Sequence, residues 1–191
     1  MSIAAQLLRG LRLTLLLWFL TVVVITLPML GLARLVAPDA ATGSLLRSGD
    51  RVVGARLIGQ GFSSARYLQS RPAGAPNLAA SNPELTTRVA AAASRWQSAG
   101  VAQPAADLLL DSGSGVDPHI SLAAARQQLP RLARERQLPL AELERLIPQH
   151  EEGPLGVQAI EPVVNVLTFN LALDQLASSS TTQSPPAPAR P

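Results

Sequence analysis

The stretch LTLLLWFLTVVVITLPMLGLA, residues 13–33, has no charged side chain and lies between Arg12 and Arg34. At about 1.5 Å of rise per residue, a helix of this length spans about 31 Å, close to the hydrocarbon thickness of a bilayer. We expect Pro28 to bend its outer third. A cleaved signal peptide has an apolar core of only about 7–15 residues and then a small-x-small site. The sequence therefore favours an uncleaved transmembrane helix over a signal peptide.

The charges that flank this helix predict its orientation. Arg9, Arg12 and the free amino group precede the helix, whereas Arg34 is the only basic residue close behind it. Basic residues are enriched on the cytoplasmic side of membrane helices. The sequence therefore predicts a cytoplasmic N-terminus, residues 1–12, and an extracytoplasmic location for everything that follows the helix.

Composition excludes several classes of protein. Hydrophobic residues make up 47% of the chain and charged residues 15%, and all 16 basic side chains are Arg. A chain without Lys has no P-loop lysine, no kinase lysine and no Schiff-base lysine. Between residues 35 and 177 there are 12 Arg and 13 acidic residues, a balance that argues against nucleic-acid binding. The absence of Cys removes disulfides, thiol catalysis and zinc ribbons.

The remainder of the chain divides by composition. We expect a linker at 34–43, one folded domain at 44–176 and a disordered tail at 177–191, where Ser, Thr and Pro dominate and no large apolar side chain occurs.

The folded domain is predicted to be a small mixed α/β domain of the α+β kind. Asn82-Pro83-Glu84 is a strong helix start, because Asn caps, Pro suits the first turn and Glu suits the positive end of the helix dipole. The expected elements are a strand or strand pair at 51–60, a helix at 83–98, a buried strand at 106–110, a helix from Ser121 that Pro130 should bend or restart, a helix from about Pro139, and a strand at 162–167 that runs into a short helix.

Asp111-Ser-Gly-Ser-Gly-Val-Asp-Pro-His119 gathers most of the polar chemistry of the domain. Its commonest interpretation is a polar turn that leads into the N-cap of the next helix. A second interpretation is an anion site, because a glycine-rich loop before a helix presents backbone N–H groups, here from Ser112 to Gly115 with Ser121. A third is a hydrolase that uses Ser112 or Ser114 with His119. We assign no catalytic residue and no metal ligand from the sequence.

Several motifs, in order, resemble the C subunit of bacterial Kdp potassium-transporting ATPases. The resemblance covers about residues 13–176. It rests on the single spanning helix and on five further motifs, which are Leu57-Ile-Gly-Gln-Gly-Phe62, Tyr67 with Arg71-Pro72, Asn77-Leu78 with Ser81-Asn-Pro-Glu-Leu85, Asp111 to Ser121, and Val163-Val-Asn-Val-Leu167 with Asn170-Leu-Ala-Leu-Asp174.

The resemblance implies a non-catalytic accessory subunit of the bacterial inner membrane. Its partners would be a channel-like subunit that translocates potassium and a P-type ATPase subunit that hydrolyses ATP. The family is also described as a catalytic chaperone that raises ATP affinity, and the residues proposed for that role match Ser112, Gly113, Ser114, Gly115 and Gln128 here. ATP is therefore a possible ligand by resemblance. The alternative function is a free-standing, membrane-anchored binding domain for a small anionic ligand.

The spanning helix offers one candidate face for partner helices. Lipid chains are as apolar as Leu, so shape and polar contacts select the partner of a membrane helix. Thr14 and Thr21 are seven residues apart, which is about two turns, and therefore share a face. We expect this face to meet the complex.

Overall fold

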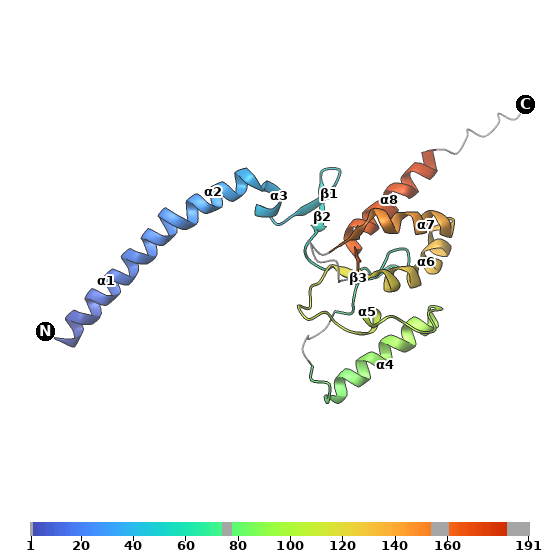
Figure 1. The fold of residues 1–191 in the computed structure, drawn as a ribbon, viewed down its shortest axis with the longest axis horizontal. Helices are drawn as coiled ribbons and strands as arrows, with labels where there is room; N and C mark the ends of the chain where they lie inside the picture. Colours follow the sequence, from blue (N-terminus) through green and yellow to red (C-terminus); the bar gives the residue numbers. More distant parts are fainter. Residues whose placement is uncertain (1, 74–77, 154–160, 183–191) are drawn as a thin grey trace, which may run out of the picture. The chain divides into compact units, whose positions relative to one another are not determined.

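The computed structural model describes residues 2–73, 78–153 and 161–182. The chain divides into two compact units, Met1–Leu45 and Leu46–Pro191. The first unit consists of helices, and the second is a small α+β domain with two small sheets (Figure 1).

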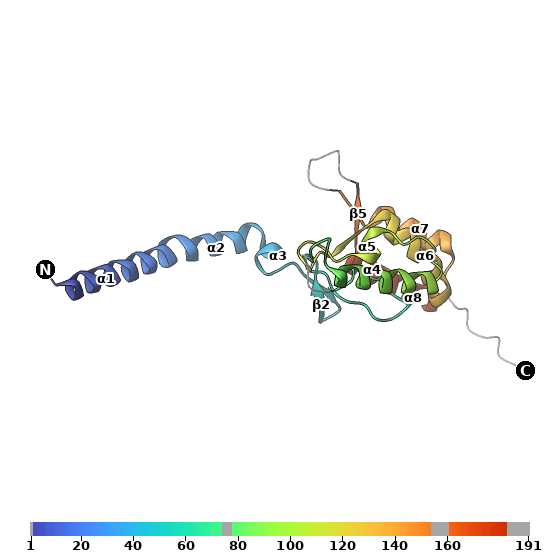
Figure 2. The same cartoon turned by 90° about the horizontal axis from the view of Figure 1, so that it is seen from below.

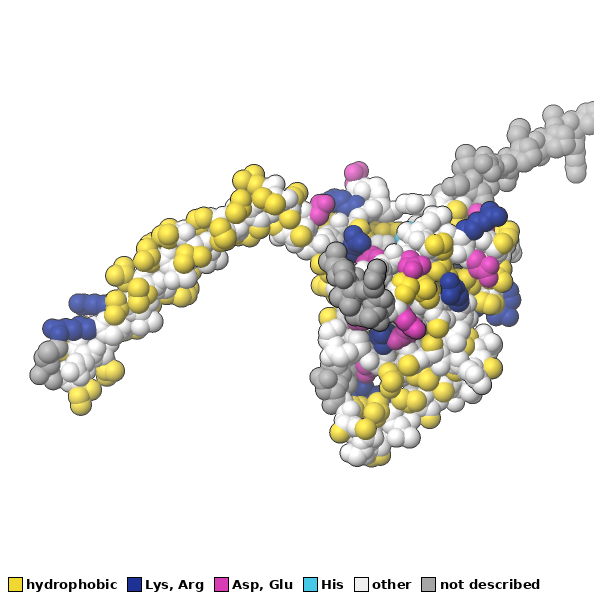
Figure 3. Space-filling view, viewed as in Figure 1, with side chains coloured by type: hydrophobic (Ala, Val, Ile, Leu, Met, Phe, Trp, Pro, Cys, Tyr) yellow, Lys and Arg dark blue, Asp and Glu magenta, His cyan; other side chains and the backbone are white. Residues whose placement is uncertain are grey.

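The first unit is one nearly continuous apolar helix. It comprises α1 (Ile3–Thr21), the π-helical turn η1 (Val22–Thr26) and α2 (Leu27–Val36). Together these 34 residues are long and apolar enough to cross a membrane, and none of the most apolar window is buried inside the protein. Figure 3 shows hydrophobic side chains along the length of this helix, with arginines near its amino-terminal end. The predicted segment 13–33 lies within it.

Pro28 affects the helix through the turn that precedes it. Proline has no N–H, and its ring collides with the carbonyl group four residues back. The helix widens at η1, where the N–H of Leu27 bonds to the carbonyl oxygen of Val22, five residues back. Such a π-turn accommodates proline without ending the helix.

The expected linker, residues 34–43, is largely helical. Helix α2 continues through Val36, and the short helix α3 (Pro38–Ala41) follows directly. Proline at the first position and Asp39 in the first turn both favour a helix start.

A hairpin begins the second unit. Strand β1 (Leu45–Ser48) pairs with β2 (Arg51–Ala55) across a two-residue turn. Gly49 in the turn has a φ of 59°, which favours glycine. The predicted strand pair at 51–60 was therefore right about β2 but missed β1, and residues 56–58 form a turn.

Three helices follow the predicted pattern and one does not. Helix α4 (Pro83–Ser98) is capped by Asn82, whose side chain accepts from the Glu84 N–H. Residues 106–110 were predicted to be a strand, but α5 (Ala106–Leu109) is a helical turn that contacts α4 and α6. An apolar run this short does not distinguish strand from helix, and its packing decides. The other two predicted helices are α6 (Leu122–Arg136) and α7 (Leu140–Leu146), followed by the 3-10 turn η2 (Ile147–Gln149).

Helix α6 passes through Pro130 without restarting. Its neighbours Leu129 and Leu132 are fully or almost fully buried. Tertiary packing on this face therefore outweighs the hydrogen bond that proline removes.

The second sheet is antiparallel, with the order β3-β5-β4. Strand β5 (Val163–Asn165) lies between β3 (His119–Ser121) and β4 (Glu151–Glu152), with His119 opposite Asn165. Helix α8 (Val166–Thr182) continues from β5, so the first residues of the predicted disordered tail are helical, and residues 183–191 lie outside the described part. Figures 1 and 2 place the strands at one end of the domain, with α6, α7 and α8 extending from it.

One core joins these helices to the sheet. Its most buried side chains come from α5, α6, α7, β5 and α8, and include Leu108, Leu132, Leu143, Val164 and Phe169. Trp96 attaches α4 to this core, because its ring is 2% exposed and its Nε1–H donates to the carbonyl oxygen of Leu108 at 3.0 Å.

Side chains satisfy the backbone of an irregular segment at residues 65–69. Leu68 in this segment is fully buried, and buried backbone groups need partners. Asn170 pairs with both backbone groups of Leu68, and Gln128 pairs with both backbone groups of Gln69, at 2.8–3.0 Å. The remaining carbonyl oxygens accept from two arginines, Ala65 and Tyr67 from Arg131 and Arg66 from Arg136. We call these four side chains the carbonyl clamp.

We predict that Asn170→Ala destabilises the domain. The substitution leaves the N–H and the carbonyl group of Leu68 without partners, which costs about 1–3 kcal/mol. Urea unfolding of the full chain in mild detergent, followed by circular dichroism, measures the change in the free energy of unfolding. Gln97→Ala, on the exposed face of α4, is the control and should stay within about 0.5 kcal/mol. Equal effects of the two substitutions would contradict the role of the clamp.

Candidate functional site

The loop 111–119, which leads from α5 into β3, is held by its own serines. The hydroxyl of Ser112 accepts from the Asp117 N–H, and the hydroxyl of Ser114 accepts from the Val116 N–H, both at 3.3 Å. Gly115 has a φ of 73°, which favours glycine. The two serines thus stabilise the turn in which they lie, as the polar-turn interpretation predicts.

A second segment closes against this loop. The N–H of Gly59 donates to the carbonyl oxygen of Val116 at 2.7 Å. A Cβ atom at Gly59 would come within 2.6 Å of the carbonyl oxygen of Asp117. Only glycine permits this approach, and it brings the Leu57-Ile-Gly-Gln-Gly-Phe62 motif against the Ser112–Gly115 motif.

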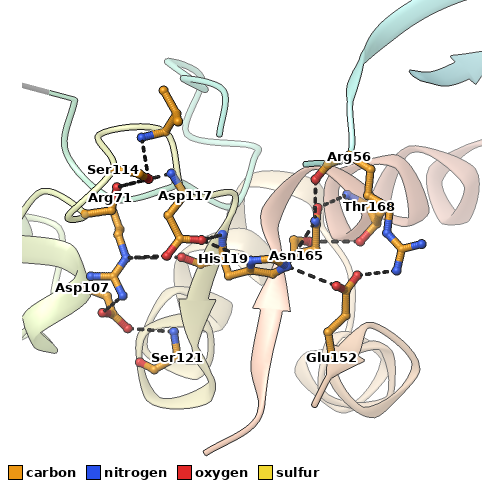
Figure 4. A network of polar contacts seen from close by, with 12 residues as sticks. Arg56, Arg71, Asp107, Ser114, Asp117, His119, Ser121, Glu152, Asn165 and Thr168 are labelled. Atoms are coloured by element: carbon orange, nitrogen blue, oxygen red, sulfur yellow. Dashed lines mark hydrogen bonds and ion pairs between the residues drawn. The ribbon is translucent and has the colours of Figure 1, made fainter. Parts of the chain in front are cut away.

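A polar network extends from the loop across the sheet (Figure 4). His119 lies between two carboxylates, with Nδ1 3.1 Å from Asp117 and Nε2 3.1 Å from Glu152. Glu152 also accepts from Arg56 at 2.9 Å, and the Asn165 amide donates to the Arg56 carbonyl oxygen at 2.9 Å. This network joins the end of β2 to β3, β4 and β5.

Arg71 ties the other end of the loop. Its guanidinium lies 2.5 Å from Asp107 and 3.8 Å from Asp117, and its Nε donates to the carbonyl oxygen of His119 at 3.3 Å. Asp107 in turn accepts from the N–H of Ser121 at 2.7 Å. The side chain of Ser121 caps α6 by accepting from Ala124. Ser121 is therefore engaged with α6 and Asp107.

The geometry does not support the hydrolase alternative. Catalysis by a Ser-His pair needs a ring nitrogen directed at the serine hydroxyl. Both ring nitrogens of His119 instead face carboxylates, and the hydroxyls of Ser112 and Ser114 bond within their own loop.

A pocket of about 190 Å³ lies beside the contact between the 111–119 loop and the segment around Gly59. Ser112 and Gly115 line it together with Arg71 and Arg95, which come from other parts of the chain. Asp117 also lines it and offsets part of the positive charge. The loop itself contains no basic side chain, and tertiary structure brings two arginines to the pocket it borders.

Gln128 does not line this pocket. It is fully buried in α6, where its amide bonds to Gln69, Arg131 and the carbonyl oxygen of Ala124. Gln69 does line the pocket. Gln128 thus supports the pocket wall from behind, while Ser112 and Gly115 border the pocket directly.

The structure defines a class of protein, namely a small α+β domain joined to one apolar helix long enough to cross a membrane. The comparisons give the family. The chain belongs to the KdpC family, the c chain of K+-transporting ATPases, whose sequence pattern matches residues 7–175. This confirms the resemblance found in the motifs.

Individual relatives align with this chain over nearly their whole length. The chain is 48% identical to the potassium-transporting ATPase KdpC subunit of Synechocystis sp., over 86% of this chain and 95% of the relative. It is 42% identical to KdpC subunit 1 of Nostoc sp., over 92% and 98%, and 41% identical to the KdpC subunit of Yersinia pestis, over 95% and 97%.

Two charged residues of the network were not predicted from the sequence. Arg56 and Glu152 are 96 positions apart, and only the pairing of β4 with β5 brings Glu152 beside His119.

Burial and neighbouring charges act in opposite directions on the pKa of Glu152. Partial burial alone would raise the pKa of Glu152, but hydrogen bonds from Arg56 and His119, with their charges, outweigh burial and lower it. At His150, burial lowers the pKa and the nearby charge of Glu152 offsets part of that change.

We predict that Glu152→Gln alters stability in a pH-dependent way. Because the pKa of Glu152 is lowered in the folded state, its carboxylate stabilises the protein above its ordinary pKa of 4.5 and stops doing so as the pH falls through the folded value. The variant should lose about 1 kcal/mol near neutral pH. Its difference from the wild type should shrink in acid.

Thermal unfolding of the full chain in mild detergent, from pH 7 downward, would measure this difference. The control is Glu151→Gln, a neighbouring exposed carboxylate. A constant difference between Glu152→Gln and the wild type at all pH values would contradict the assignment.

Proposed function

We propose that this chain is a non-catalytic accessory subunit of an ATP-driven, high-affinity potassium uptake complex. It would assemble with, and stabilise, the channel-like subunit that translocates potassium and the P-type ATPase subunit that hydrolyses ATP. The observation that carries the proposal is the apolar helix Ile3–Val36, which buries nothing within its own chain and therefore needs lipid or partner helices around it. Family membership supports the assignment to a potassium-transporting ATPase.

The proposed location is the bacterial inner (plasma) membrane, with residues 1–12 in the cytoplasm and the α+β domain outside. The support is the placement of Arg9 and Arg12 before the span.

Thr14 and Thr21 form the proposed partner face. Both lie on α1 before the π-turn, so the seven-residue spacing keeps them on one side. The Thr21 hydroxyl donates to the carbonyl oxygen of Leu17 at 2.8 Å, which leaves its lone pairs to accept a hydrogen bond from a neighbouring helix.

We predict that replacing Thr14 and Thr21 together by Leu weakens co-purification with the two large subunits without preventing membrane insertion. Each interhelical hydrogen bond of this kind contributes only about 0.6 kcal/mol, so the loss should be graded. Pull-down in mild detergent, with increasing detergent as the stress, measures it. Leu16→Ile with Leu20→Ile is the matched control.

If the control pair dissolved the complex while the threonine pair did not, the partner face would be another one. Purification of the wild-type chain as a clean monomer would contradict the accessory-subunit assignment and favour a free-standing anchored binding domain.

A second proposed property is anion binding at the pocket beside Ser112, Gly113, Ser114 and Gly115. Arg95 and Arg71 bring positive charge to it, although Asp107 and Asp117 already pair with Arg71. A volume of about 190 Å³ is below the usual 300 Å³ or more of a small-molecule site, so it suits a phosphate group better than a whole nucleotide. Contact with the phosphates of ATP, and a chaperone role that raises ATP affinity, would need this pocket on the cytoplasmic side. Gln128 would act there only through Gln69.

The orientation of the chain in the membrane decides whether this pocket can contact cytoplasmic ATP. We predict that a reporter fused after Leu176 is active only outside the cytoplasm, because the basic residues before the span retain the N-terminus inside. Parallel fusions of a periplasm-active and a cytoplasm-active enzyme at this position provide the measurement and its control. Activity of the cytoplasmic reporter would reverse the orientation and place the pocket beside ATP.

A further inference from the structure

The π-turn η1 leaves one backbone carbonyl group without the donor that a helix normally supplies. The carbonyl oxygen of Val23 would accept from the N–H of Leu27 in an α-helix, or from that of residue 28 in a π-helix. The N–H of Leu27 bonds to the carbonyl oxygen of Val22 instead, and Pro28 has no N–H. Neither helical register therefore provides a partner for the carbonyl oxygen of Val23.

The threonine hydroxyls on either side of this carbonyl group are engaged elsewhere. Ser and Thr side chains can satisfy a carbonyl group that proline sets free in a membrane helix. Here the hydroxyl of Thr21 donates to the carbonyl oxygen of Leu17 at 2.8 Å, and that of Thr26 donates to the carbonyl oxygen of Thr21 at 3.4 Å. A hydroxyl group has one hydrogen to donate, so neither threonine also serves Val23.

The depth of Val23 makes this vacancy important. Val23 is the central residue of the uncharged segment 13–33, ten positions from each end. Ten helical residues measure about 15 Å, which is half the hydrocarbon thickness of a bilayer. When the segment spans a bilayer, this carbonyl group lies near the midplane, where no water is available and an unpaired backbone group is strongly unfavourable. A donor must therefore come from another protein chain.

The helix can be approached closely on the same side. The carbonyl group of Val23 points along the helix axis towards Leu27, and Gly31 lies one turn beyond Leu27 in α2. Gly31 has no side chain to separate two backbones, and its missing Cβ atom would meet nothing within 4 Å. Small residues are enriched where membrane helices pack together. Gly31 therefore gives a second helix access to this side of the span.

We propose that the carbonyl oxygen of Val23 accepts a hydrogen bond from a hydroxyl or amide side chain on a transmembrane helix of a partner subunit, which packs against α2 at Gly31. The inference rests on the proposed function, because it requires the apolar helix to span the membrane within a complex. Hydroxyl and amide groups are donors that enter hydrocarbon without a charge.

A second copy of this chain does not supply such a donor at this depth. Within residues 19–27, Thr21 and Thr26 are the only residues whose side chains carry a hydrogen-bond donor. Both hydroxyls already donate within the helix. A parallel copy would therefore bring no free donor to the level of Val23, and the donor belongs to a different chain.

Pro28→Ala provides the first test, because it restores the missing N–H and allows the α-helical hydrogen bonds to close around Val23. The full chain is produced with the channel-like and ATPase subunits, and dissociation of the complex is measured in mild detergent. The dissociation constant should rise about threefold, and at most about 18-fold, which is the range for hydrogen bonds between membrane helices. Pro38→Ala, at the start of α3 and outside the apolar segment, is the matched control and should leave dissociation unchanged.

Gly31→Leu tests the close approach of the partner helix. The added side chain should hold the partner away from α2 and weaken the complex by at least as much as Pro28→Ala. Gly10→Leu is the matched control, because Gly10 also lies on the apolar helix with open space at its Cβ position, but before Arg12. It should leave the complex intact.

An infrared measurement separates hydrogen bonding from a change in the bend of the helix. A full chain with heavy carbon and oxygen isotopes in the carbonyl group of Val23, made by ligating a labelled synthetic segment to the remainder, gives this group an amide I band of its own. The band should move to lower wavenumber when the two large subunits are added, because a hydrogen bond weakens the C=O bond.

An unmoved band in a complex that assembles would overturn the inference and leave the proposed function intact. A band that is already low for the chain alone in bilayers would mean that water or a second copy supplies the donor, and the partner assignment would be wrong. Unchanged dissociation with both Pro28→Ala and Gly31→Leu would also overturn it. If the wild-type chain did not associate with the large subunits at all, the proposed function itself would have failed.

Discussion

Five consecutive carbonyl oxygens, from Ala65 to Gln69, accept hydrogen bonds from side chains, and the rest of the domain depends on this arrangement. The segment is neither helix nor strand, and at its buried residue, Leu68, an unpaired backbone group would cost about 1–3 kcal/mol. The carbonyl clamp draws its donors from α6 and α8, so the segment joins these two helices in place of a regular strand. It also delivers Gln69, Ser70 and Arg71 to the wall of the pocket.

The polar network connects the 65–69 segment with the surface of the domain. Arg71 follows the clamped segment and ties Asp107 and Asp117, His119 passes the connection to Glu152, and Arg56 ends it beside the hairpin. The loop beside the pocket and the turn that exposes Leu57 and Ile58 are thus supported by one chain of ion pairs and hydrogen bonds. Because the members of this network share partners, their contributions to stability are expected to be non-additive.

Helix caps and loops could be predicted from the sequence, but contacts between residues far apart in the chain could not. Asn82-Pro83-Glu84 predicted the start of α4 because a cap depends on residues two or three positions apart. The 106–110 run was misassigned because only the packing of Leu108 beneath Trp96 determines its conformation. Ser112 and Gly115 were correctly associated with a loop, but Arg71 and Arg95 reach it through tertiary structure. Gln128 was named only through the family resemblance, and its contacts with Gln69 across 59 positions have no sequence signal.

The fold pairs the polar side chains of the loop and the network with one another, which limits their conformational freedom before any partner binds. The serines, the histidine and the ion-paired carboxylates of the loop and network are engaged in internal contacts. Association then pays little for ordering side chains, and more of the contact energy remains as affinity. The apolar helix differs from the domain, since none of its most apolar window is buried inside the protein, as expected of a helix that packs against lipid or neighbouring helices. A domain whose polar groups are paired internally and a helix that is not buried together fit the KdpC subunit of a K+-transporting ATPase complex.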